Sequence, residues 1–191
     1  MANKEDLRVQ RTKKALAEAF MSLLSTKPFD DITINELCDV AGVRRATFYK
    51  HYKDKHDFLA AYTRSLRADF DETLDPIYTA KQAKEYCVAY AKAAVDYINS
   101  HEAAVNNLIK SGLFSYAIAI IIEQNCKDSL ARLRKGVEAG LKLPASAEVT
   151  AGMLAGGVFN SVVSWVLGGK KTSPEEFANQ IGAVVSAVLG E

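Results

Sequence analysis

Apolar residues recur every three or four positions along most of the chain, which is the spacing of one face of an α-helix. In residues 7–25, for example, one apolar stripe contains Leu16, Phe20, Leu23 and Leu24. The strict alternation of apolar and polar residues that marks a strand is hard to find. Proline occurs only four times, while alanine, leucine, lysine and glutamate, which favour helix, are abundant. The pattern therefore predicts an all-α fold.

Start and stop signals divide the chain into about nine helices. Residues 27–28, a lysine and a proline, end the first one. The next begins with a capping box, in which Thr33 is the N-cap and Glu36 reaches back to the Thr33 amide. Gly42 tolerates the left-handed conformation that ends this helix, and a third begins near Arg44. The later helices are expected at residues 54–74, 80–99, 102–112, 113–140, 146–168 and 174–189.

The second and third predicted helices are short and joined by a tight glycine turn, which is the helix-turn-helix pattern. We therefore expect a three-helix DNA-binding domain over residues 1–53. A larger helical domain follows over residues 54–191, and Asp54 caps its first helix. The core of the small domain is expected to contain Phe20, Leu24, Ile34, Leu37, Val40, Val43 and Phe48.

The net charge of +1 favours no particular partner, but the basic residues are unevenly distributed. Five of them lie between residues 44 and 55, against the single acidic Asp54, and a second basic cluster covers residues 8–14. A protein that is neutral overall can still present one basic face to DNA phosphates. A solvated surface would give the same pattern, so charge alone does not decide the function.

The segment from Ile32 to Phe58, ITINELCDVAGVRRATFYKHYKDKHDF, resembles the DNA-binding signature of the TetR/AcrR family. The shared features are a capped helix, an Ala-Gly-Val turn, a short recognition helix and a lysine at the next helix start. Two positions depart from the family pattern. Arg44 stands where a small capping residue is frequent, so the third helix should lack a side-chain cap. Cys38 stands where alanine is usual, and we assign it to packing.

DNA contacts are expected from the recognition helix and its surroundings. Its N-terminal residues face base edges, and an arginine such as Arg44 or Arg45 can pair bidentately with guanine. The polar tips of Tyr49, Lys50 and His51 suit the DNA backbone. The resemblance implies phosphate contacts from Thr33, Thr47, Tyr49, His51 and Lys55, and base readout by Asn35 and residues 44–47. The complete expected set is Thr33, Asn35, Arg44, Arg45, Ala46, Thr47, Tyr49, Lys50, His51 and Lys55.

For the larger domain, the resemblance implies an effector pocket and a dimer interface. The pocket, if present, is expected among Tyr62, Tyr90, Tyr97, Phe114 and Tyr116, although aromatic residues in such helices more often have an ordinary core or surface role. Residues 149–169 carry no formal charge but contain five glycines, so we interpret them as an interface helix and not as a membrane span. The interface is expected to include Gly152, Gly156, Phe159 and Trp165, and the last two helices should pair with their copies.

The sequence contains no catalytic, nucleotide-binding or metal-binding motif, so we expect neither an enzyme nor a cofactor. Three solitary cysteines and a polar N-terminus favour the reducing cytoplasm. The resemblance implies a homodimeric transcriptional regulator, usually a repressor released by a small-molecule effector. Its partners would be double-stranded DNA with a near-palindromic operator, the effector and a second copy of the chain. The alternative is a TetR-like adaptor that responds to a protein partner.

Overall fold

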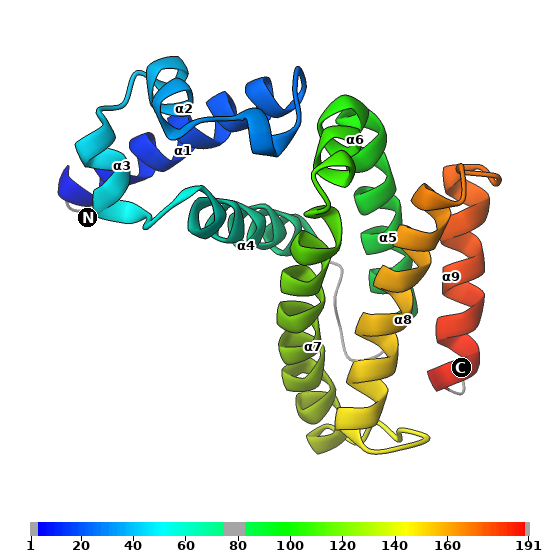
Figure 1. Ribbon diagram of the computed structural model, residues 1–191. Helices are drawn as coiled ribbons and strands as arrows, with labels where there is room; N and C mark the ends of the chain where they lie inside the picture. The colour runs from blue at the N-terminus through cyan, green and yellow to red at the C-terminus, as the bar shows by residue number, and fades with distance from the viewer. Residues whose placement is uncertain (1–3, 75–82, 190–191) are drawn as a thin grey trace. The chain divides into compact units, whose positions relative to one another are not determined.

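A computed structural model describes residues 4–74 and 83–189 of the chain (Figure 1). These residues form nine α-helices and one short 3-10 helix, without a strand, so the all-α prediction is confirmed. The connection between the fourth and fifth expected helices lies outside the described residues. The helices are α1 (Lys4–Leu24), η1 (Phe29–Asp31), α2 (Ile34–Ala41), α3 (Arg45–His51), α4 (Lys55–Leu74), α5 (Ala83–Ser100), α6 (Glu102–Lys110), α7 (Phe114–Glu138), α8 (Ala147–Leu167) and α9 (Pro174–Leu189).

The chain divides into two compact units. The first unit consists of residues 1–64 and 101–117, so that α6 and the start of α7 belong with the helix-turn-helix segment. The second consists of residues 65–100 and 118–191, and α4 and α7 contribute to both units. The expected boundary after residue 53 divides the chain by function and stays a prediction.

An aromatic cluster forms the centre of the first unit. The ring of Phe20 packs edge-to-face against Phe29, Phe58 and Tyr62, with centroid distances of 6.1, 5.3 and 5.2 Å. Such pairs add about 0.5–1.5 kcal/mol each to the burial of the rings. Phe29 belongs to the short segment between α1 and α2. This segment is a 3-10 helix that places the ring in the core.

The expected core of the small domain is confirmed except at Val40, whose side chain is 52% exposed. The buried face of α2 runs through Leu37, Cys38 and Ala41. Val40 and Ala41 both lie about one helical turn after Leu37, but only Ala41 packs against the core. Cys38 is fully buried and burial raises the pKa of its thiol, which fits the expected packing role.

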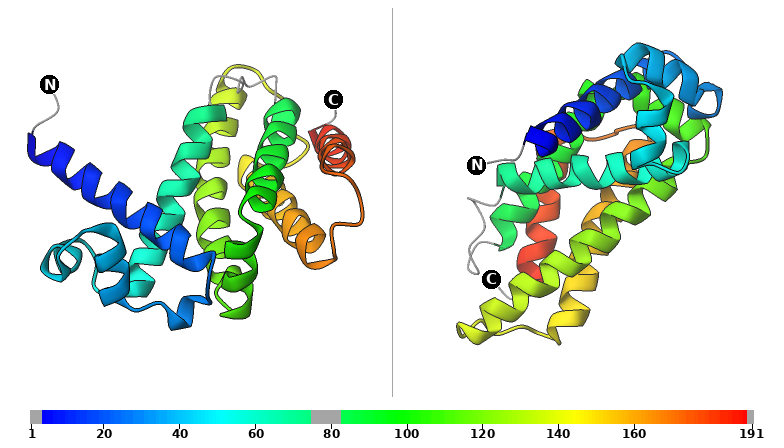
Figure 2. Two further views of the ribbon diagram at one scale, coloured as in Figure 1. Left: turned by 90° about the horizontal axis from the view of Figure 1, so that it is seen from above. Right: turned by 90° about the vertical axis from the view of Figure 1, so that its left-hand side faces the viewer.

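In the second unit, α5 packs along α9 and α8 (Figure 2). Helix α8 is long and apolar enough to cross a membrane by length and composition, but core helices of soluble proteins pass the same test. One face of α8 is buried in this unit through residues such as Ala151, Leu154 and Val158. Small residues make this close packing possible.

Candidate nucleic-acid interface and ligand cavity

The turn between α2 and α3 has the local structure that its residues dictate. Thr33 is the N-cap of α2, and its Oγ1 accepts a hydrogen bond of 3.2 Å from the Glu36 amide. Gly42 ends the helix with φ of 64°, in the left-handed region that glycine tolerates. The reciprocal half of the predicted capping box is wrong. The Glu36 carboxylate instead pairs with Lys27 Nζ, with 2.7 Å between Nζ and Oε1, which ties α2 to the end of α1.

Helix α3 has one buried face and one exposed face. Phe48 is fully buried and anchors the helix in the aromatic cluster. Arg44 is the N-cap and makes no side-chain capping bond, as the sequence predicted, so the first amides of α3 are left without a side-chain cap. The guanidinium of Arg45 lies 5.8 Å from the ring centroid of Tyr49, one turn further along the exposed face.

The predicted DNA-binding residues lie at the helix-turn-helix segment, mostly on its exposed surface. The exposed ones are Thr33, Asn35, Arg44, Arg45, Ala46, Tyr49 and Lys50, and the partly buried ones are Thr47, His51 and Lys55. The structure therefore brings basic and polar side chains together around the start of α3. Their contacts with DNA stay a prediction.

Lys55 differs from the others because its ammonium is engaged inside the unit. Its Nζ donates hydrogen bonds to the carbonyl oxygens of Phe29, Asp30 and Ile32, at 3.1, 2.9 and 3.3 Å. It also lies 4.7 Å from the centroid of the Phe29 ring. An ammonium has three N–H donors, so these carbonyl oxygens occupy its capacity. Lys55 holds η1 against the start of α4, a role that the family resemblance did not indicate.

The start of α4 is capped as the sequence predicted. Asp54 Oδ1 accepts hydrogen bonds from the amides of His56 and Asp57, at 2.8 and 2.9 Å. The Asp57 carboxylate reaches back to the Lys53 amide at 3.0 Å. The hydrogen bonds from the Asp57 and His56 amides lower the pKa of the Asp54 carboxyl, because they favour its charged form.

Helix α6 is bonded to the end of α1 within the first unit. The buried amide of Asn107 donates from Nδ2 to the carbonyl oxygen of Leu24, the last residue of α1, at 2.8 Å. Ser111 Oγ accepts a hydrogen bond of 2.9 Å from the Phe29 amide and donates to the Asn107 carbonyl. These two side chains therefore hold α6 on the segment that leads from α1 into η1.

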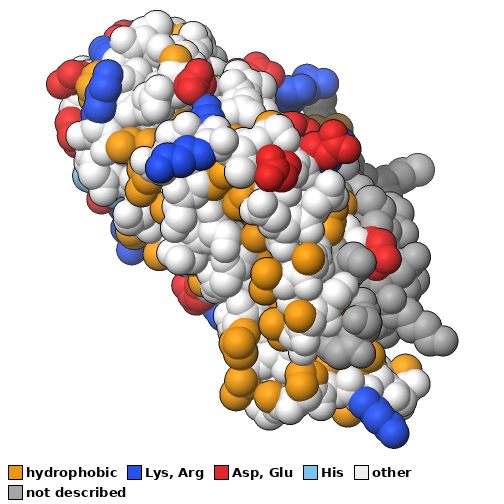
Figure 3. All heavy atoms as spheres, turned by 90° about the vertical axis from the view of Figure 1, so that its right-hand side faces the viewer, with side chains coloured by type: hydrophobic (Ala, Val, Ile, Leu, Met, Phe, Trp, Pro, Cys, Tyr) orange, Lys and Arg blue, Asp and Glu red, His pale blue; other side chains and the backbone are white. Residues whose placement is uncertain are grey.

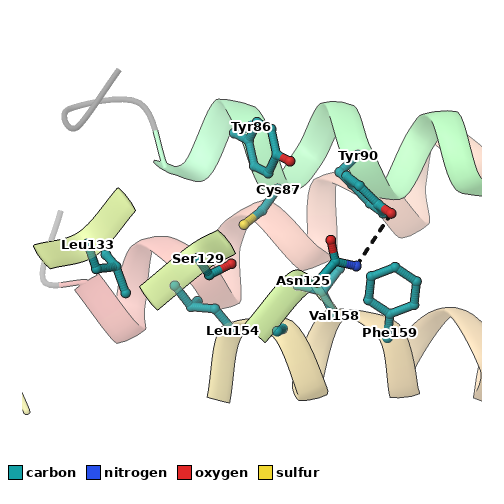
Figure 4. Close-up of a pocket in the computed structure, with 10 residues that line it drawn as sticks. Tyr86, Cys87, Tyr90, Asn125, Ser129, Leu133, Leu154, Val158 and Phe159 are labelled. Carbon is teal, nitrogen blue, oxygen red and sulfur yellow. Dashed lines mark hydrogen bonds between the residues drawn. The ribbon is translucent and has the colours of Figure 1, made fainter. Parts of the chain in front are cut away.

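A cavity lies in the second unit between α5, α7 and α8 (Figure 4). Asn125, Ser129 and Leu133 stand one turn apart on one face of α7, and aromatic and aliphatic side chains form the other walls. The cavity has a volume of about 40 Å³ and is partly open to solvent. The lining residues are Tyr86, Cys87, Tyr90, Asn125, Ser129, Leu133, Leu154, Ala155, Val158 and Phe159.

A buried polar network adjoins this cavity. Both Nε and Nη2 of Arg67 donate to Asn125 Oδ1, at 3.1 and 3.0 Å. Arg67 Nη2 also pairs with Asp128 Oδ2 at 2.7 Å, which compensates the buried guanidinium charge. On the cavity side, Asn125 Nδ2 donates to the Tyr90 hydroxyl at 3.4 Å. Burial raises the pKa of Tyr90, so the phenol is neutral around physiological pH.

Of the five aromatic residues expected in an effector pocket, Tyr90 alone lines this cavity. Tyr62 packs in the aromatic cluster of the first unit, Phe114 is buried in that unit, and Tyr116 is 44% exposed. Tyr97 is partly buried on α5 and is not among the lining residues. The prediction considered aromatic residues alone and therefore missed Asn125 and Ser129. The sequence signal for these two residues was a pair of polar side chains four positions apart on the inward face of α7.

The four residues expected at a dimer interface fall on two different faces of α8. Gly152 is exposed and Gly156 partly so. Phe159 is 5% exposed and packs against Tyr90, while Trp165 is 9% exposed and stacks on Phe177. The Trp165 indole N–H donates to the carbonyl and hydroxyl oxygens of Thr172. Phe159 and Trp165 therefore belong to the core of their own unit.

Among the described residues, no group of three or more histidine, cysteine, aspartate or glutamate side chains could hold a metal ion. The two features that remain are an exposed basic helix in the first unit and a mainly apolar cavity in the second.

Sequence comparisons agree with the helix-turn-helix assignment. Residues 14–62 match the model of the family described as bacterial regulatory proteins, tetR family. The uncharacterized HTH-type transcriptional regulator YxbF of Bacillus subtilis (strain 168) is 34% identical over 91 residues. This match covers 47% of the chain but only 23% of that protein, so the chain spans less than a quarter of the relative's length.

Solved structures share the fold over nearly the whole chain. A TetR-family regulator from Streptomyces coelicolor A3 has a TM-score of 0.64 and 16% identity, covering 95% of this chain and 96% of the other. The dihydroxyacetone kinase operon activator DhaS has a TM-score of 0.65 and 16% identity, with 94% and 96% covered. FadR from Bacillus subtilis, in complex with stearoyl-CoA, has a TM-score of 0.63 and 16% identity, with 90% and 96% covered.

The all-helical fold, the capped helix-turn-helix segment and these similarities agree with one another, and the similar proteins are described as transcriptional regulators. The family match in sequence lies in the helix-turn-helix segment, whereas the match in fold covers 95% of the chain. The chain therefore resembles TetR-family regulators, with the family match in sequence over residues 14–62.

Proposed function

We propose that the chain is a dimeric, sequence-specific DNA-binding repressor that a small molecule releases from its operator. The observation that carries the proposal is the exposed N-terminal end of α3, where Arg44 and Arg45 stand on a helix anchored by the buried Phe48. Helix-turn-helix proteins insert this end of the helix into the major groove, where arginine pairs with guanine.

The exposed face of α8 and α9 supports dimerisation. Met153 and Leu167 of α8 and Val184 of α9 are large apolar residues that the chain leaves exposed, next to Gly152 and Gly156. Figure 3 shows hydrophobic side chains gathered on the side of the molecule where these helices lie. Exposed apolar patches of this kind mark interaction sites, and glycine allows helices to approach closely. A two-fold dimer would place two recognition helices about 34–36 Å apart, one DNA turn.

Release by a small molecule requires that the ligand bind one DNA-binding state better than the other. The cavity is lined by α5 and α7, and α6 connects these two helices along the chain. Because Asn107 and Ser111 bond α6 to α1 and η1, a movement of the cavity walls would reach the helix-turn-helix segment through α6. Helix α4, which carries Arg67, offers a second continuous connection.

The ligand and the sign of regulation are proposals independent of the fold. The similar structures include an operon activator, so repression rests on the usual behaviour of the family. FadR binds stearoyl-CoA, but the cavity of this chain measures about 40 Å³, far less than a long acyl chain occupies, so we do not extend that ligand to this chain.

The dimer and DNA binding can be tested together. We expect the wild type to sediment as a dimer and the Met153→Asp variant as a monomer with much weaker operator binding. Val137→Asp, at an exposed apolar position on α7, is the matched control and should remain dimeric. A folded Met153→Asp variant that is still a dimer would contradict the proposed interface, and a wild type without DNA affinity would contradict the proposed function.

A further inference from the structure

None of the described residues that line the cavity carries a formal charge. Two guanidinium groups lie beside the cavity: that of Arg67, which is paired with Asp128 and bonded to Asn125, and that of Arg132, 4.8 Å from the ring centroid of the lining residue Tyr86. Since both are already engaged with side chains of this unit, a carboxylate or ammonium group in the cavity would lose its hydration without a free counterion, and this costs far more than burying a neutral polar group. The lining therefore disfavours charged ligands of either sign.

The polar groups of the cavity wall favour a ligand that accepts a hydrogen bond. Arginine only donates, so the two bonds from Arg67 fix which end of the Asn125 amide is the oxygen. The Nδ2 group then faces the cavity, where its bond to the Tyr90 hydroxyl, at 3.4 Å, is longer than an ordinary N–H···O bond. The Ser129 hydroxyl on the same wall makes no hydrogen bond with the described residues. Both groups have donor capacity left.

The size of the cavity limits the ligand to a compact molecule. An enclosed volume of about 40 Å³ has room for a few waters, whereas a dry cavity that binds benzene measures about 150 Å³. A ring-sized ligand would thus occupy the cavity and its open mouth and would push the lining side chains of α5, α7 and α8 apart. Such a ligand would bind the conformation with the helices apart more tightly than the conformation with the helices together, and regulation requires this difference in affinity.

We propose that this cavity binds a compact, uncharged, mainly apolar molecule whose single oxygen accepts hydrogen bonds from Asn125 and Ser129. This inference rests on the proposed ligand-responsive regulator and adds the chemical class of the ligand. The aromatic and aliphatic walls provide the affinity, and the two donors on α7 select an oxygen at one position.

The test uses four ring compounds of similar size. These are cyclohexanone, the apolar methylenecyclohexane, the cation cyclohexylammonium and the anion cyclohexanecarboxylate. Their binding to the purified full-length protein is measured by calorimetry and ligand-detected NMR, without DNA. We expect cyclohexanone to bind about threefold to tenfold more tightly than methylenecyclohexane, the gain of one net hydrogen bond. Both ions should bind at least about tenfold more weakly than cyclohexanone.

Two variants locate the binding. Ala155→Leu fills the cavity. It should lower the affinity for both neutral ligands by at least about tenfold, because the ligands lose apolar space and contacts. Ala131→Leu makes the same change at an exposed position of α7 and should bind like the wild type. Asn125→Leu should remove the preference for the ketone and keep binding of the apolar ring. If Asn125→Leu does not fold, Ser129→Ala, a milder change, should reduce the same preference.

Three results would overturn the inference. They are equal or tighter binding of an ion, ketone binding that Ala155→Leu leaves unchanged, and no binding of either neutral ring at millimolar concentration by folded protein. The DNA affinity of the same preparations is measured separately. Intact operator binding with any of these results would reject this ligand class and leave the DNA-binding function standing. Loss of DNA binding by the wild type would instead reject the proposed function.

Discussion

The side chains of Arg67 and Asn125 are joined by two hydrogen bonds, since both Nε and Nη2 of the guanidinium donate to the one amide oxygen. One residue lies on α4 and the other on α7, 58 positions later. The arrangement fixes the orientation of Asn125 at the cavity wall. A buried charge thus positions a neutral group at the cavity wall, while Asp128 compensates that charge.

Arg67→Met should therefore destabilise the second unit. The change leaves Asn125 Oδ1 and Asp128 without their main partner, and we expect the free energy of unfolding to fall by about 1–3 kcal/mol. The carboxylate of Asp128 is a third exposed, which keeps the loss below that of a fully buried pair. Arg64→Met, at an exposed position one turn earlier, is the control, and urea unfolding of both variants is the measurement. Equal stability of the two variants would contradict the network.

Lys55 and Lys50 should have separable roles. Lys55→Met should lower the free energy of unfolding by about 1–3 kcal/mol, because it removes a charged donor from three carbonyl oxygens. Lys50→Met should leave stability unchanged but weaken DNA binding and flatten the slope of log affinity against log salt by about 1, the loss of one phosphate contact. If Lys55→Met alters only the salt slope, Lys55 contacts DNA phosphate, as the resemblance implied, and the structural role fails.

Asn107→Leu tests the contact between α6 and α1. The Leu24 carbonyl would be left without its buried donor, and we expect a loss of about 1–3 kcal/mol in unfolding free energy. Asn106→Leu places the same side chain at the neighbouring exposed position and should change stability little. Chemical denaturation followed by circular dichroism compares the two. A matching loss in both variants would mean that the hydrogen bond contributes nothing.

The cap of α4 predicts a pH dependence. The pKa of Asp54 is lowered in the folded chain, so the folded state favours its charged form. The stabilisation is present above the unfolded carboxyl pKa of about 4 and is lost as pH falls through the lower folded value. Asp54→Asn keeps a cap that does not titrate. Below pH 4 the wild type should therefore lose stability relative to this variant, measured by thermal melts between pH 3 and pH 6. A difference constant across that range would contradict the prediction.

Arg45→Ala should weaken specific DNA binding by about 1–3 kcal/mol and relax the base preference at one position of each half-site. The residue is exposed at the first turn of α3, so its removal should leave the melting temperature unchanged. Fluorescence anisotropy with a DNA fragment that the wild type binds, and with single-base variants of that fragment, measures both the affinity and the base preference. An unchanged preference would exclude Arg45 from base readout.

The helices and the helix-turn-helix segment could be predicted from the sequence because local chemistry determines them. Thr33, Gly42 and Asp54 act within a few residues of their own positions, and the structure shows each in its expected place. Contacts between distant segments could not be predicted in the same way. Spacing alone does not choose between residues 40 and 41 for the inner face of α2, and a lysine at a helix start gives no sign of three carbonyl oxygens some 25 positions earlier.

The cavity shows the same limit. Aromatic residues are spread over α4 to α7, and only the packing decides that Tyr90 faces the cavity while Tyr62 enters the aromatic cluster of the first unit. Asn125 was the more informative residue, because a polar side chain on the buried face of a helix needs partners. Those partners lie on α4 and α5, far away in the sequence.

The central claim is that this chain reads a specific DNA sequence as a dimer through the start of α3. The most direct measurement is selection of fragments from sheared genomic DNA of the source organism, with the wild type and Arg45→Ala in parallel, followed by sequencing. With the wild type we expect an inverted repeat whose half-sites lie about one DNA turn, 10–10.5 bp, or a multiple of it, apart. With the Arg45→Ala variant we expect weaker and less selective enrichment. No enriched sequence with folded, dimeric wild type, or the same motif with both proteins, would contradict the claim.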